Sequence, residues 1–322
     1  MIQKCPLCEK TGTILQKETH IDKGTTYTLF ECTLCSAQFW NPLKNPGAEW
    51  YEHDTKYAQR NVDPILKPNL KHKDTIGYLS NSVGKVLDVG CGVGNFLALA
   101  QKKGWDCWGI DFDRDSIVTA KNTFGLDNLE PLDLTTFIQN HSQERFNLVT
   151  FFDVFEHIDN HVAFITEVKS VLQPAGYIAL SVPYKHSWRF LVPHDWPPRH
   201  LTRWDDVSIS YFLEANGFTV KKIWKESATW YFLVMKLRWK YGKFVRFGLV
   251  KSAKQKAYVK NATQTTSATA PTYSASIKLM HAVAKAKDVV LFGIPALVVW
   301  MVLQFTDKRN TDFYLIAQVK ND

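Results

Sequence analysis

The segment from Lys85 to Asp113 constrains the fold more than any other part of the sequence. A short apolar run leads into glycines at alternate positions, Gly90, Gly92 and Gly94. Glycine has no Cβ, so such a turn lets the backbone approach a ligand closely, and the helix after it points its N-terminus at that ligand. A second apolar run ends in Asp111, 19 residues beyond Gly92, where a doubly wound α/β fold places the acid that binds ribose hydroxyls. The segment therefore predicts a nucleoside-binding α/β domain.

Two classes of nucleoside ligand fit a strand–turn–helix–strand unit of this kind. A dinucleotide site requires Gly-x-Gly-x-x-Gly, but the third glycine position counted from Gly90 and Gly92 is Asn95. The sequence instead reads Asp-x-Gly-x-Gly-x-Gly from Asp88, which resembles motif I of the class I S-adenosylmethionine-dependent methyltransferases. The resemblance implies a doubly wound, seven-stranded, mostly parallel Rossmann-like sheet. It also implies S-adenosylmethionine as the cofactor, with the glycine turn facing its methionine part.

The same resemblance assigns cofactor contacts to the carboxyl ends of successive strands. Asp111 is expected to bind the ribose, and Phe112 to pack on the adenine. In this family, an acid after the third strand accepts the adenine amino group and the next backbone amide meets a ring nitrogen; these positions are Asp133 and Leu134. The full expected set of cofactor-binding residues is Asp88, Gly90, Gly92, Gly94, Asn95, Phe96, Asp111, Phe112, Asp133, Leu134, Phe152 and Asp153.

A second motif follows the predicted fourth strand, residues 146–152. Asp153, Glu156 and His157 form an Asp-x-x-Glu-His signature. It resembles that of ubiquinone-pathway O-methyltransferases and of many methyltransferases from surface-polysaccharide gene clusters. Histidine titrates near neutral pH, so His157 is a candidate base for taking a proton from a hydroxyl acceptor. The alternative is a histidine that only orients the loop by hydrogen bonding.

The loop after the fifth predicted strand is dense in His, Trp, Arg and Pro. Its Pro-x-His-Leu-Thr-Arg-Trp stretch resembles the same two groups, in which this loop lines the acceptor pocket. Proline pairs exclude a helix here. We therefore expect substrate contacts from this loop, and His200 is a second catalytic candidate. The expected substrate-side residues are His186, His194, Arg199 and Trp204.

Four of the six cysteines form two C-x2-C pairs near the N-terminus. Between the pairs lie 23 residues, a spacing that matches the four-thiolate site of a zinc ribbon, with Cys5, Cys8, Cys32 and Cys35 as ligands. So short a segment cannot bury a large core, and metal ligation would supply its folding free energy. Four thiolates leave no open position, so the zinc is expected to be structural. This cysteine usage fits a reducing compartment rather than a disulfide framework.

The family topology requires a seventh strand antiparallel to the sixth, and the good candidate is residues 312–320. Residues 226–311 are then an insertion between two neighbouring strands. It contains an aromatic and basic run from Trp230 to Val250 and a nearly apolar run from Val289 to Phe305. This profile favours helices lying in the plane of an anionic membrane surface. A buried helix over the pocket or at a dimer contact is the main alternative, and a membrane span is a third.

Charge is concentrated in the same insertion. Between residues 221 and 260 there are twelve Lys or Arg and one acid, whereas the whole chain carries a net charge of +8. The remainder of the protein is therefore slightly acidic. A basic block interleaved with aromatic residues indicates a phosphate-bearing surface, either anionic lipid or nucleic acid.

Together these features predict four segments and one activity. The segments are a zinc ribbon (1–45), a linker or lid helix (46–82), the methyltransferase domain (83–225 plus 312–320) and the helical insertion (226–311). The expected reaction methylates a hydroxyl of a small-molecule, glycan or lipid-linked acceptor. Without a recognisable secretory signal, a cytoplasmic protein at the inner face of the membrane is expected.

Two other functions stay open at this stage. One is an RNA methyltransferase that grips phosphates with the ribbon and the basic block, and the other is a non-catalytic scaffold that retains the cofactor fold. The fourth strand is followed by Phe-Asp-Val-Phe rather than an Asn-Pro-Pro-Tyr-type base-methylating motif, which argues against a nucleic-acid partner. The intact acids and glycines argue against a scaffold. The acceptor and the oligomeric state are left open.

Overall fold

The computed structural model describes residues 2–47, 50, 69–187, 195–241 and 275–320. The chain forms two compact units. The larger comprises Met1–Ser227 together with Asn310–Asp322, and the smaller comprises Ala228–Arg309. Each unit is described by itself.

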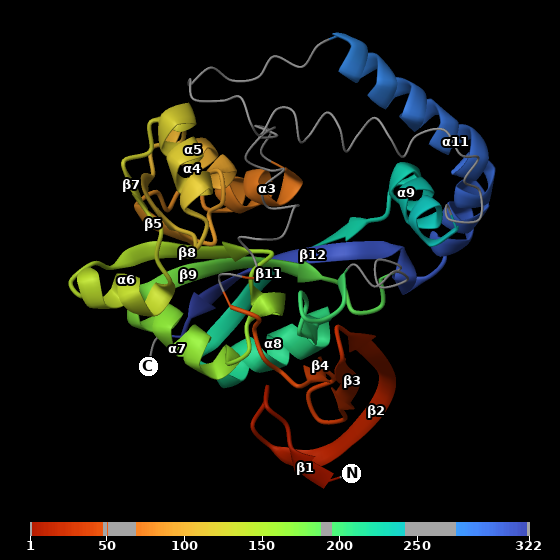
Figure 1. Cartoon of the computed structure of the whole chain (residues 1–322). Coiled ribbons are helices and arrows are strands. Elements are labelled where there is room, and N and C mark those ends of the chain that lie inside the picture. Colours follow the sequence, from red (N-terminus) through yellow and green to blue (C-terminus); the bar gives the residue numbers. More distant parts are fainter. Residues whose placement is uncertain (1, 48–49, 51–68, 188–194, 242–274, 321–322) are drawn as a thin grey trace. The chain divides into compact units, whose positions relative to one another are not determined.

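The larger unit is built on a seven-stranded sheet with the order β11-β12-β9-β8-β5-β6-β7 (Figure 1). Neighbouring strands are parallel except at β12, which runs antiparallel to both β9 and β11. This order confirms the predicted doubly wound sheet and its inserted last strand. The strands are β5 (Lys85–Val89), β6 (Asp106–Ile110), β7 (Asn128–Glu130), β8 (Phe146–Phe152), β9 (Leu172–Pro183), β11 (Phe218–Ser227) and β12 (Asn310–Val319).

Helices cover both faces of this sheet. Figure 1 shows α3, α4 and α5 over one face and α6, α7 and α8 over the other. Their bounds are α3 Leu70–Tyr78, α4 Asn95–Gln101, α5 Arg114–Phe124, α6 Leu134–Asn140, α7 His161–Ser170 and α8 Asp206–Ala215. The expected lid helix in 46–82 is thus described only as α3, because residues 51–68 lie outside the described part of the chain.

Acidic residues that follow strands begin several of these helices. Asp113, Asp133 and Asp205 are the N-caps of α5, α6 and α8, and each carboxylate accepts a hydrogen bond from a first-turn backbone N–H. Those N–H groups have no partner inside the helix, so the cap satisfies them and ends the preceding loop sharply. The strand–acid–helix order in the sequence therefore marks the start of these three helices.

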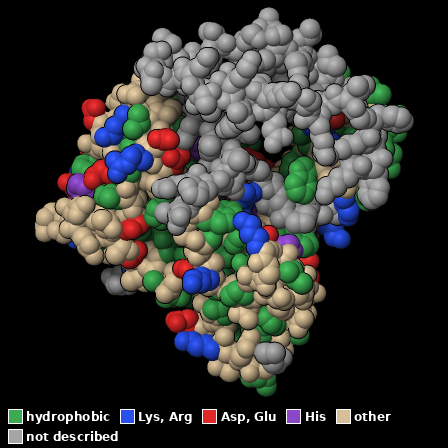
Figure 2. All heavy atoms as spheres, in the orientation of Figure 1, with side chains coloured by type: hydrophobic (Ala, Val, Ile, Leu, Met, Phe, Trp, Pro, Cys, Tyr) green, Lys and Arg blue, Asp and Glu red, His purple; other side chains and the backbone are tan. Residues whose placement is uncertain are grey.

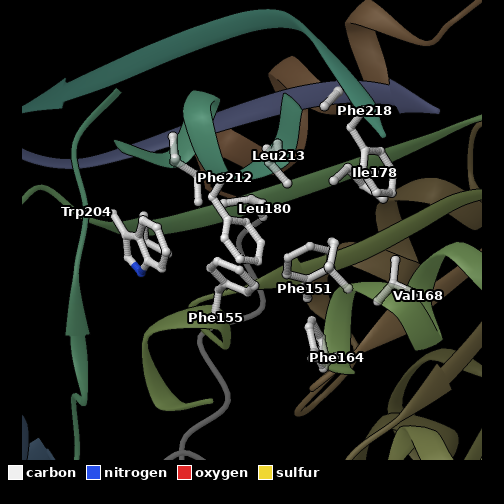
Figure 3. Close-up of a cluster of buried hydrophobic side chains, with 14 of the residues drawn as sticks. Phe151, Phe155, Phe164, Val168, Ile178, Leu180, Trp204, Phe212, Leu213 and Phe218 are labelled. Carbon is white, nitrogen blue, oxygen red and sulfur yellow. The ribbon is translucent and has the colours of Figure 1, made fainter. Parts of the chain in front are cut away.

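Each face of the sheet has its own hydrophobic core. The core beneath α6, α7 and α8 is aromatic, with ring centroids 5.3 Å apart for Phe151 and Phe164 and 5.5 Å apart for Phe155 and Phe212 (Figure 3). The other core joins α3, α4 and α5 to the opposite face. Strands β8 and β9 are buried on both sides, which is why they read as continuous apolar runs rather than alternating ones.

The N-terminal strands form a second, five-stranded sheet with the order β1-β2-β3-β4-β10. Its strands are β1 (Ile2–Lys4), β2 (Thr11–Asp22), β3 (Thr25–Cys32), β4 (Gln38–Asn41) and β10 (Thr202–Arg203). The β2–β3 hairpin turns through Lys23 and Gly24, both at positive φ, as a two-residue type I′ turn requires. The last strand, β10, comes from the loop before α8, so this sheet is completed by a segment distant in sequence.

The smaller unit is a pair of packed helices, α9 (Trp230–Tyr241) and α11 (Ala275–Leu303). The indole Nε1 of Trp230 donates to the Gly293 carbonyl at 2.9 Å, and Arg238 pairs with the buried Asp288 at 2.8 Å. Within the described residues, neither helix is long and apolar enough to cross a membrane.

Charge on the visible surface is mixed. On the face shown in Figure 2, the Lys and Arg side chains of the described residues are interspersed with Asp and Glu rather than gathered into one patch. Half of the twelve Lys and Arg residues counted between residues 221 and 260 lie outside the described part of the chain, in 242–260. Phosphate binding by this basic block therefore stays a prediction.

Candidate active site

The glycine turn lies at the carboxyl end of β5, where the strand order reverses between β5 and β8 and such sheets bind ligands. Its three glycines all have positive φ. A Cβ at Gly94 would lie 2.9 Å from Leu126 and 3.0 Å from Ala120, so this glycine is required for the packing of α4. A Cβ at Gly92 would meet nothing within 4 Å. The space above Gly92 is where a ligand can approach the backbone.

Asp111 ties this turn to the next loop. Its Oδ2 accepts a hydrogen bond from the Gly92 amide at 2.8 Å, and its Oδ1 accepts from the Asp113 amide at 2.8 Å. The carboxylate is therefore held in one orientation beside the turn, and a carboxylate has further lone pairs for hydroxyl donors. Phe112, next to it, is 51% exposed, so its ring is accessible to a ligand. The ribose role of Asp111 and the adenine role of Phe112 stay predictions.

Asp88 is placed differently from its neighbours in the motif. It is 3% exposed, and its Oδ1 accepts from the Thr150 hydroxyl at 2.6 Å, across the parallel pair of β5 and β8. Burial raises the pKa of Asp88 to about 7, against the opposing effect of the Thr150 hydrogen bond. Asp88 therefore links two strands beneath the glycine turn rather than presenting its carboxyl at the surface.

The expected adenine contacts at Asp133 and Leu134 lie at the start of α6. The Asp133 side chain is exposed and caps the helix through Thr136, whose amide donates at 2.7 Å. Leu134 is buried in the aromatic core. On the other side of the turn, the Asn95 side-chain oxygen is buried and accepts no hydrogen bond from the described residues, which fits a donor supplied by a ligand.

Helix α3 brings to the site a lysine that the sequence reasoning missed. Lys71 is buried, and its Nζ donates to Asp153 Oδ2 at 2.5 Å and to Ser181 Oγ at 2.9 Å. Ser181 donates in turn to the other carboxylate oxygen of Asp153 at 2.7 Å. Asp153 itself stands at φ 55°, just after β8. The lysine thus attaches α3 to the strand ends that border the glycine turn.

The residue after this lysine completes an aromatic group with two expected cofactor residues. The ring centroid of His72 lies 5.5 Å from that of Phe96 and 5.1 Å from that of Phe152. Burial lowers the pKa of His72 to about 3, assisted by the charge of Lys71, so the ring is neutral at physiological pH. A lone lysine and histidine on a short helix carry no pattern that separates them from surface residues, so no signal in the sequence pointed to either.

Beside β8, the adjacent residues Glu156 and His157 come together with His200 from the later loop. Glu156 is buried, the ring centroids of His157 and His200 are 4.8 Å apart, and the ligand atoms of all three lie within 4.8 Å of one another. His157 Nδ1 lies 2.5 Å from the Arg199 carbonyl oxygen. A carbonyl only accepts, so Nδ1 carries the proton and Nε2 is the basic nitrogen of the neutral ring. The arrangement suits a proton relay or one divalent cation.

The substrate-side candidates fall into three environments. Arg199 lies over the ring of Trp50, with its guanidinium carbon 5.6 Å from the centroid. His186 is exposed and its Nε2 is 3.6 Å from Asp205 Oδ2. Hydrogen bonds from His186, Lys185 and Ser208 hold the pKa of Asp205 below its usual range despite its burial. His194 lies outside the described residues.

Trp204 does not have the surface position expected for a substrate contact. It is 0% exposed, and its ring packs 5.3 Å from Phe155 and 5.6 Å from Phe212 in the aromatic core (Figure 3). Its indole Nε1 is satisfied by the Thr202 hydroxyl at 2.9 Å. The Trp204 side chain therefore anchors the loop in the core. Its burial is favourable because the ring is largely apolar and its one polar group, the indole N–H, already has a hydrogen-bond partner.

The four N-terminal cysteines converge as their spacing predicted. The sulfurs of Cys5 and Cys35 are 3.9 Å apart, those of Cys8 and Cys32 are 4.0 Å apart, and all four lie within 4.8 Å of one another. Tetrahedral Zn–S bonds of about 2.3 Å place sulfurs roughly 3.8 Å apart. The donor set therefore fits a structural zinc ion.

Comparison with known proteins points in one direction. A family model described as a methyltransferase domain matches residues 51–223. The ubiquinone biosynthesis O-methyltransferase of Actinobacillus pleuropneumoniae is 29% identical over 145 residues, which cover 42% of this chain and 59% of that protein. The enzyme of the same name from Rhodopseudomonas palustris is 26% identical over 214 residues, or 64% of this chain and 83% of that protein. The chain thus spans about 59% of the length of the first of these relatives.

Solved structures support the fold alone. The crystal structure of the cyclase SpnF matches with a TM-score of 0.50 and 13% identity, covering 85% of this chain and 96% of that one. A methyltransferase from Archaeoglobus fulgidus has a TM-score of 0.49 and 18% identity, covering 82% and 99%. A cyclase on this fold shows that the architecture does not by itself specify the reaction, so function has to be argued from the site.

The buried carboxyl of Asp88 predicts a pH dependence of stability. Its folded-state pKa of about 7 lies above the unfolded value of about 4, so ionisation of Asp88 opposes folding. The stability that protonated Asp88 contributes to the folded state is fully present below about pH 4 and is lost as the pH rises through about 7. Urea unfolding of wild type and Asp88→Asn at pH 5 and pH 8 should show wild type losing stability relative to the variant. Parallel changes in the two proteins would contradict this environment for Asp88.

Proposed function

The chain belongs to the methyltransferase domain family, and from this premise we propose that it transfers the methyl group of S-adenosylmethionine to a hydroxyl of a small-molecule acceptor. The observation that carries the proposal is the junction of two sites at neighbouring strand ends. The glycine turn tied to Asp111 follows β5, and the Asp153–His157 segment follows β8, its parallel neighbour. A nucleoside cofactor held at the first would present its reactive end to the second.

The residues present fit that cofactor. The open space at Gly92, the oriented Asp111 carboxylate and the exposed Phe112 ring supply a backbone approach, hydroxyl acceptors and a stacking face. When bound, S-adenosylmethionine supplies the electrophilic methyl group. We assign the remaining expected cofactor contacts, including Asn95 and Asp133, to the same ligand. The four cysteines are proposed to hold a structural zinc ion.

The acceptor chemistry falls to His157. Its Nδ1 proton is held by the Arg199 carbonyl, so Nε2 is the atom that would take the hydroxyl proton as the acceptor oxygen attacks. Glu156 Oε1 lies 3.9 Å from Nε2, and its negative charge would stabilise the imidazolium that forms. His200 lies against the same pair and is proposed to share the proton. Positioning of the acceptor supplies the remainder of the rate enhancement.

The proposed acceptor is a hydroxyl of a quinone-like compound, a sugar nucleotide or a lipid-linked glycan. The names of the curated relatives support the first of these. The smaller unit supports a lipid-linked molecule, because helix α11 exposes a continuous apolar stripe. Its members recur every three or four residues: Val290, Leu291, Ile294, Leu297, Val298, Met301 and Val302.

The same stripe is the basis for proposing peripheral binding at the cytoplasmic membrane face. Lys308 and Arg309 are exposed just beyond α11, and α9 exposes Trp239 and Lys240. Apolar side chains flanked by aromatic and basic groups are the composition of helices that lie in the headgroup layer. An exposed stripe of this length on a soluble surface would otherwise favour association.

The cofactor site is tested by calorimetry with S-adenosylmethionine. Asp111→Ala should weaken binding by about 10- to 100-fold, because charge-assisted hydrogen bonds to the ribose and the restraint on Gly92 are lost together. Asp106→Ala is the matched control, since Asp106 is an exposed acid at the opposite end of the same strand. Its affinity should stay within about twofold of wild type. Wild type that fails to bind would reject the proposed function, and an unaffected Asp111→Ala would reject the ribose contact.

The role of His157 is tested by turnover of a soluble phenol that wild type methylates. His157→Gln should lower kcat by about 10²- to 10⁴-fold through loss of the base, with cofactor affinity unchanged. His141→Gln is the control. His141 follows the last residue of α6 and is hydrogen-bonded to Glu130, so it is a paired histidine outside the His157 group. A His157→Gln enzyme with normal kcat would leave this histidine only an orienting role.

Membrane binding is tested by flotation with phosphatidylglycerol vesicles. Strands β11 and β12 are antiparallel neighbours that meet at Ser227 and Asn310, so a two-residue Asn-Gly turn can replace residues 228–309. Wild type should float, and the shortened protein should not, while binding S-adenosylmethionine normally. A triple variant, V290D/I294D/V298D, should also stay in the soluble fraction. Flotation of the shortened protein would refute this anchor.

A further inference from the structure

The ribbon sheet and the acceptor loop are one piece of structure, and we propose that the metal-bound ribbon is a clamp that holds the acceptor loop, residues 195–205, against the His157 segment. The proposal rests on the proposed function in one respect: it takes this loop as the wall of the acceptor pocket. In this proposal the ribbon affects acceptor binding indirectly, by holding the loop in place. The cysteines themselves do not contact the acceptor. The elements involved all lie in the larger unit.

The first link is backbone pairing. Strand β10 of the loop pairs with β4 of the ribbon, with Thr202 opposite Phe39, and the Trp40 amide donates to the Leu201 carbonyl at 2.9 Å. The amide of Leu201 donates in the other direction, to the Glu156 carbonyl at 2.8 Å. The residue directly after His200 is therefore hydrogen-bonded to the ribbon on one side and to the Asp-x-x-Glu-His segment on the other.

The second link is a pair of buried cations, one near the end of the loop and one just after β9. Arg203, 6% exposed, pairs with Glu18 of β2 at 2.6 Å and lies over the Trp40 ring. Lys185 donates to the carbonyl and hydroxyl of Ser36 at 2.7 and 2.6 Å. Buried cations of this kind are costly to separate from their partners, so the end of the loop and the chain after β9 are both held to the ribbon.

Lys185 also connects the metal knuckle to the methyltransferase domain. Its Nζ lies 2.6 Å from Asp205 Oδ2, and Asp205 is the N-cap of α8. Ser36 is the residue directly after the metal ligand Cys35, and it stands at φ 63°. One ammonium thus bridges the second cysteine knuckle and the start of a core helix.

The third link is the chain that leaves the ribbon. The Asn45 side chain donates to the His157 carbonyl at 2.7 Å, and its backbone amide donates to Asp159 at 3.2 Å. Five residues later, the ring of Trp50 lies under Arg199. The ribbon and its exit segment therefore contact both segments that carry the candidate acceptor residues, and Asn45 is a positioning residue for His157.

Metal ligation controls these links because the two cysteine knuckles have little core of their own. Strand β4 begins three residues after Cys35. The buried ribbon side chains near the knuckles, such as Leu7 and Ile14, belong to the same hydrophobic cluster as the methyltransferase core, whereas Tyr27, Leu29 and Trp40 form a separate small cluster. Without the ligand cluster, the knuckle that presents Ser36 has no fixed shape. Loss of zinc should therefore free the acceptor loop while leaving the glycine turn and Asp111, which belong to other elements, as they are.

The test is hydrogen exchange by mass spectrometry on the full chain, before and after chelation, with the metal content measured. Removal of zinc should speed exchange in peptides covering 196–205 by about tenfold or more, whereas peptides of β5 and β6 should be unchanged. Calorimetry should show S-adenosylmethionine affinity within about threefold of the loaded protein. Unchanged exchange in 196–205, or cofactor binding lost together with the metal, would overturn the clamp.

A substitution that keeps all four cysteines separates the clamp from general unfolding. Glu18→Gln should retain one zinc, speed exchange in 200–204 and raise the KM for a phenol acceptor about tenfold, since the buried Arg203 loses its charged partner on the ribbon. Glu9→Gln makes the same change at an exposed ribbon pair with Lys4 and should behave as wild type. If the two variants behave alike, the clamp is refuted.

The exchange measurement needs neither cofactor nor acceptor. A chain that shows zinc-dependent protection of 196–205 but fails to bind S-adenosylmethionine would reject the proposed function and retain the mechanical link. A chain that binds the cofactor but shows no such protection would reject the clamp and retain the proposed function. The two proposals therefore fail separately.

Discussion

The parallel pairing of β5 with β8 is the constraint on which the rest of the molecule depends. It sets the carboxyl ends of the two strands side by side, with the glycine turn after one and the Asp153–His157 segment after the other. Thr150 and Asp88 are directly paired across it and share a buried hydrogen bond. Because the strand order reverses at this pair, the crossover helices leave in opposite directions and open the space in which a ligand can sit.

The two faces of the sheet support different parts of the candidate site. The layer of α3, α4 and α5 surrounds the glycine turn, with Lys71 fastening α3 to Asp153. The layer of α6, α7 and α8 carries the aromatic core, which continues into the ribbon through buried side chains such as Leu7 and Ile14. The proposed cofactor turn and Asp111 thus belong to the domain alone. The proposed acceptor segments contact both the domain and the ribbon, which is why the proposed clamp acts on them and not on the glycine turn.

Sequence reasoning succeeded where the relevant contacts are local. The glycines and Asp111 lie within one strand–turn–helix–strand unit, so their spacing predicts their arrangement. The two cysteine pairs are each local, and only one hairpin has to close to bring them together. The family motifs also named His157 and His200 as candidates, and the structure places their rings 4.8 Å apart although the residues are 43 positions apart in the sequence. The motifs did not identify Glu156 as the shared neighbour of the two histidines, even though that residue stands inside the first motif.

What the sequence by itself determined is the order of strands and helices along the chain, the glycine turn and the convergence of the four cysteines, because periodicity, caps and motif spacing depend on neighbouring residues. Only the tertiary structure decided the partners of single residues across the chain. Lys71 pairs with Asp153, which is 82 positions away in the sequence. Trp204, expected to line the acceptor pocket, is buried in the core instead. Strand β10 completes the ribbon sheet in the same way, from more than 160 positions beyond β4. Such contacts form only when the packed layers bring distant surfaces together, and no local sequence pattern specifies which surfaces will meet.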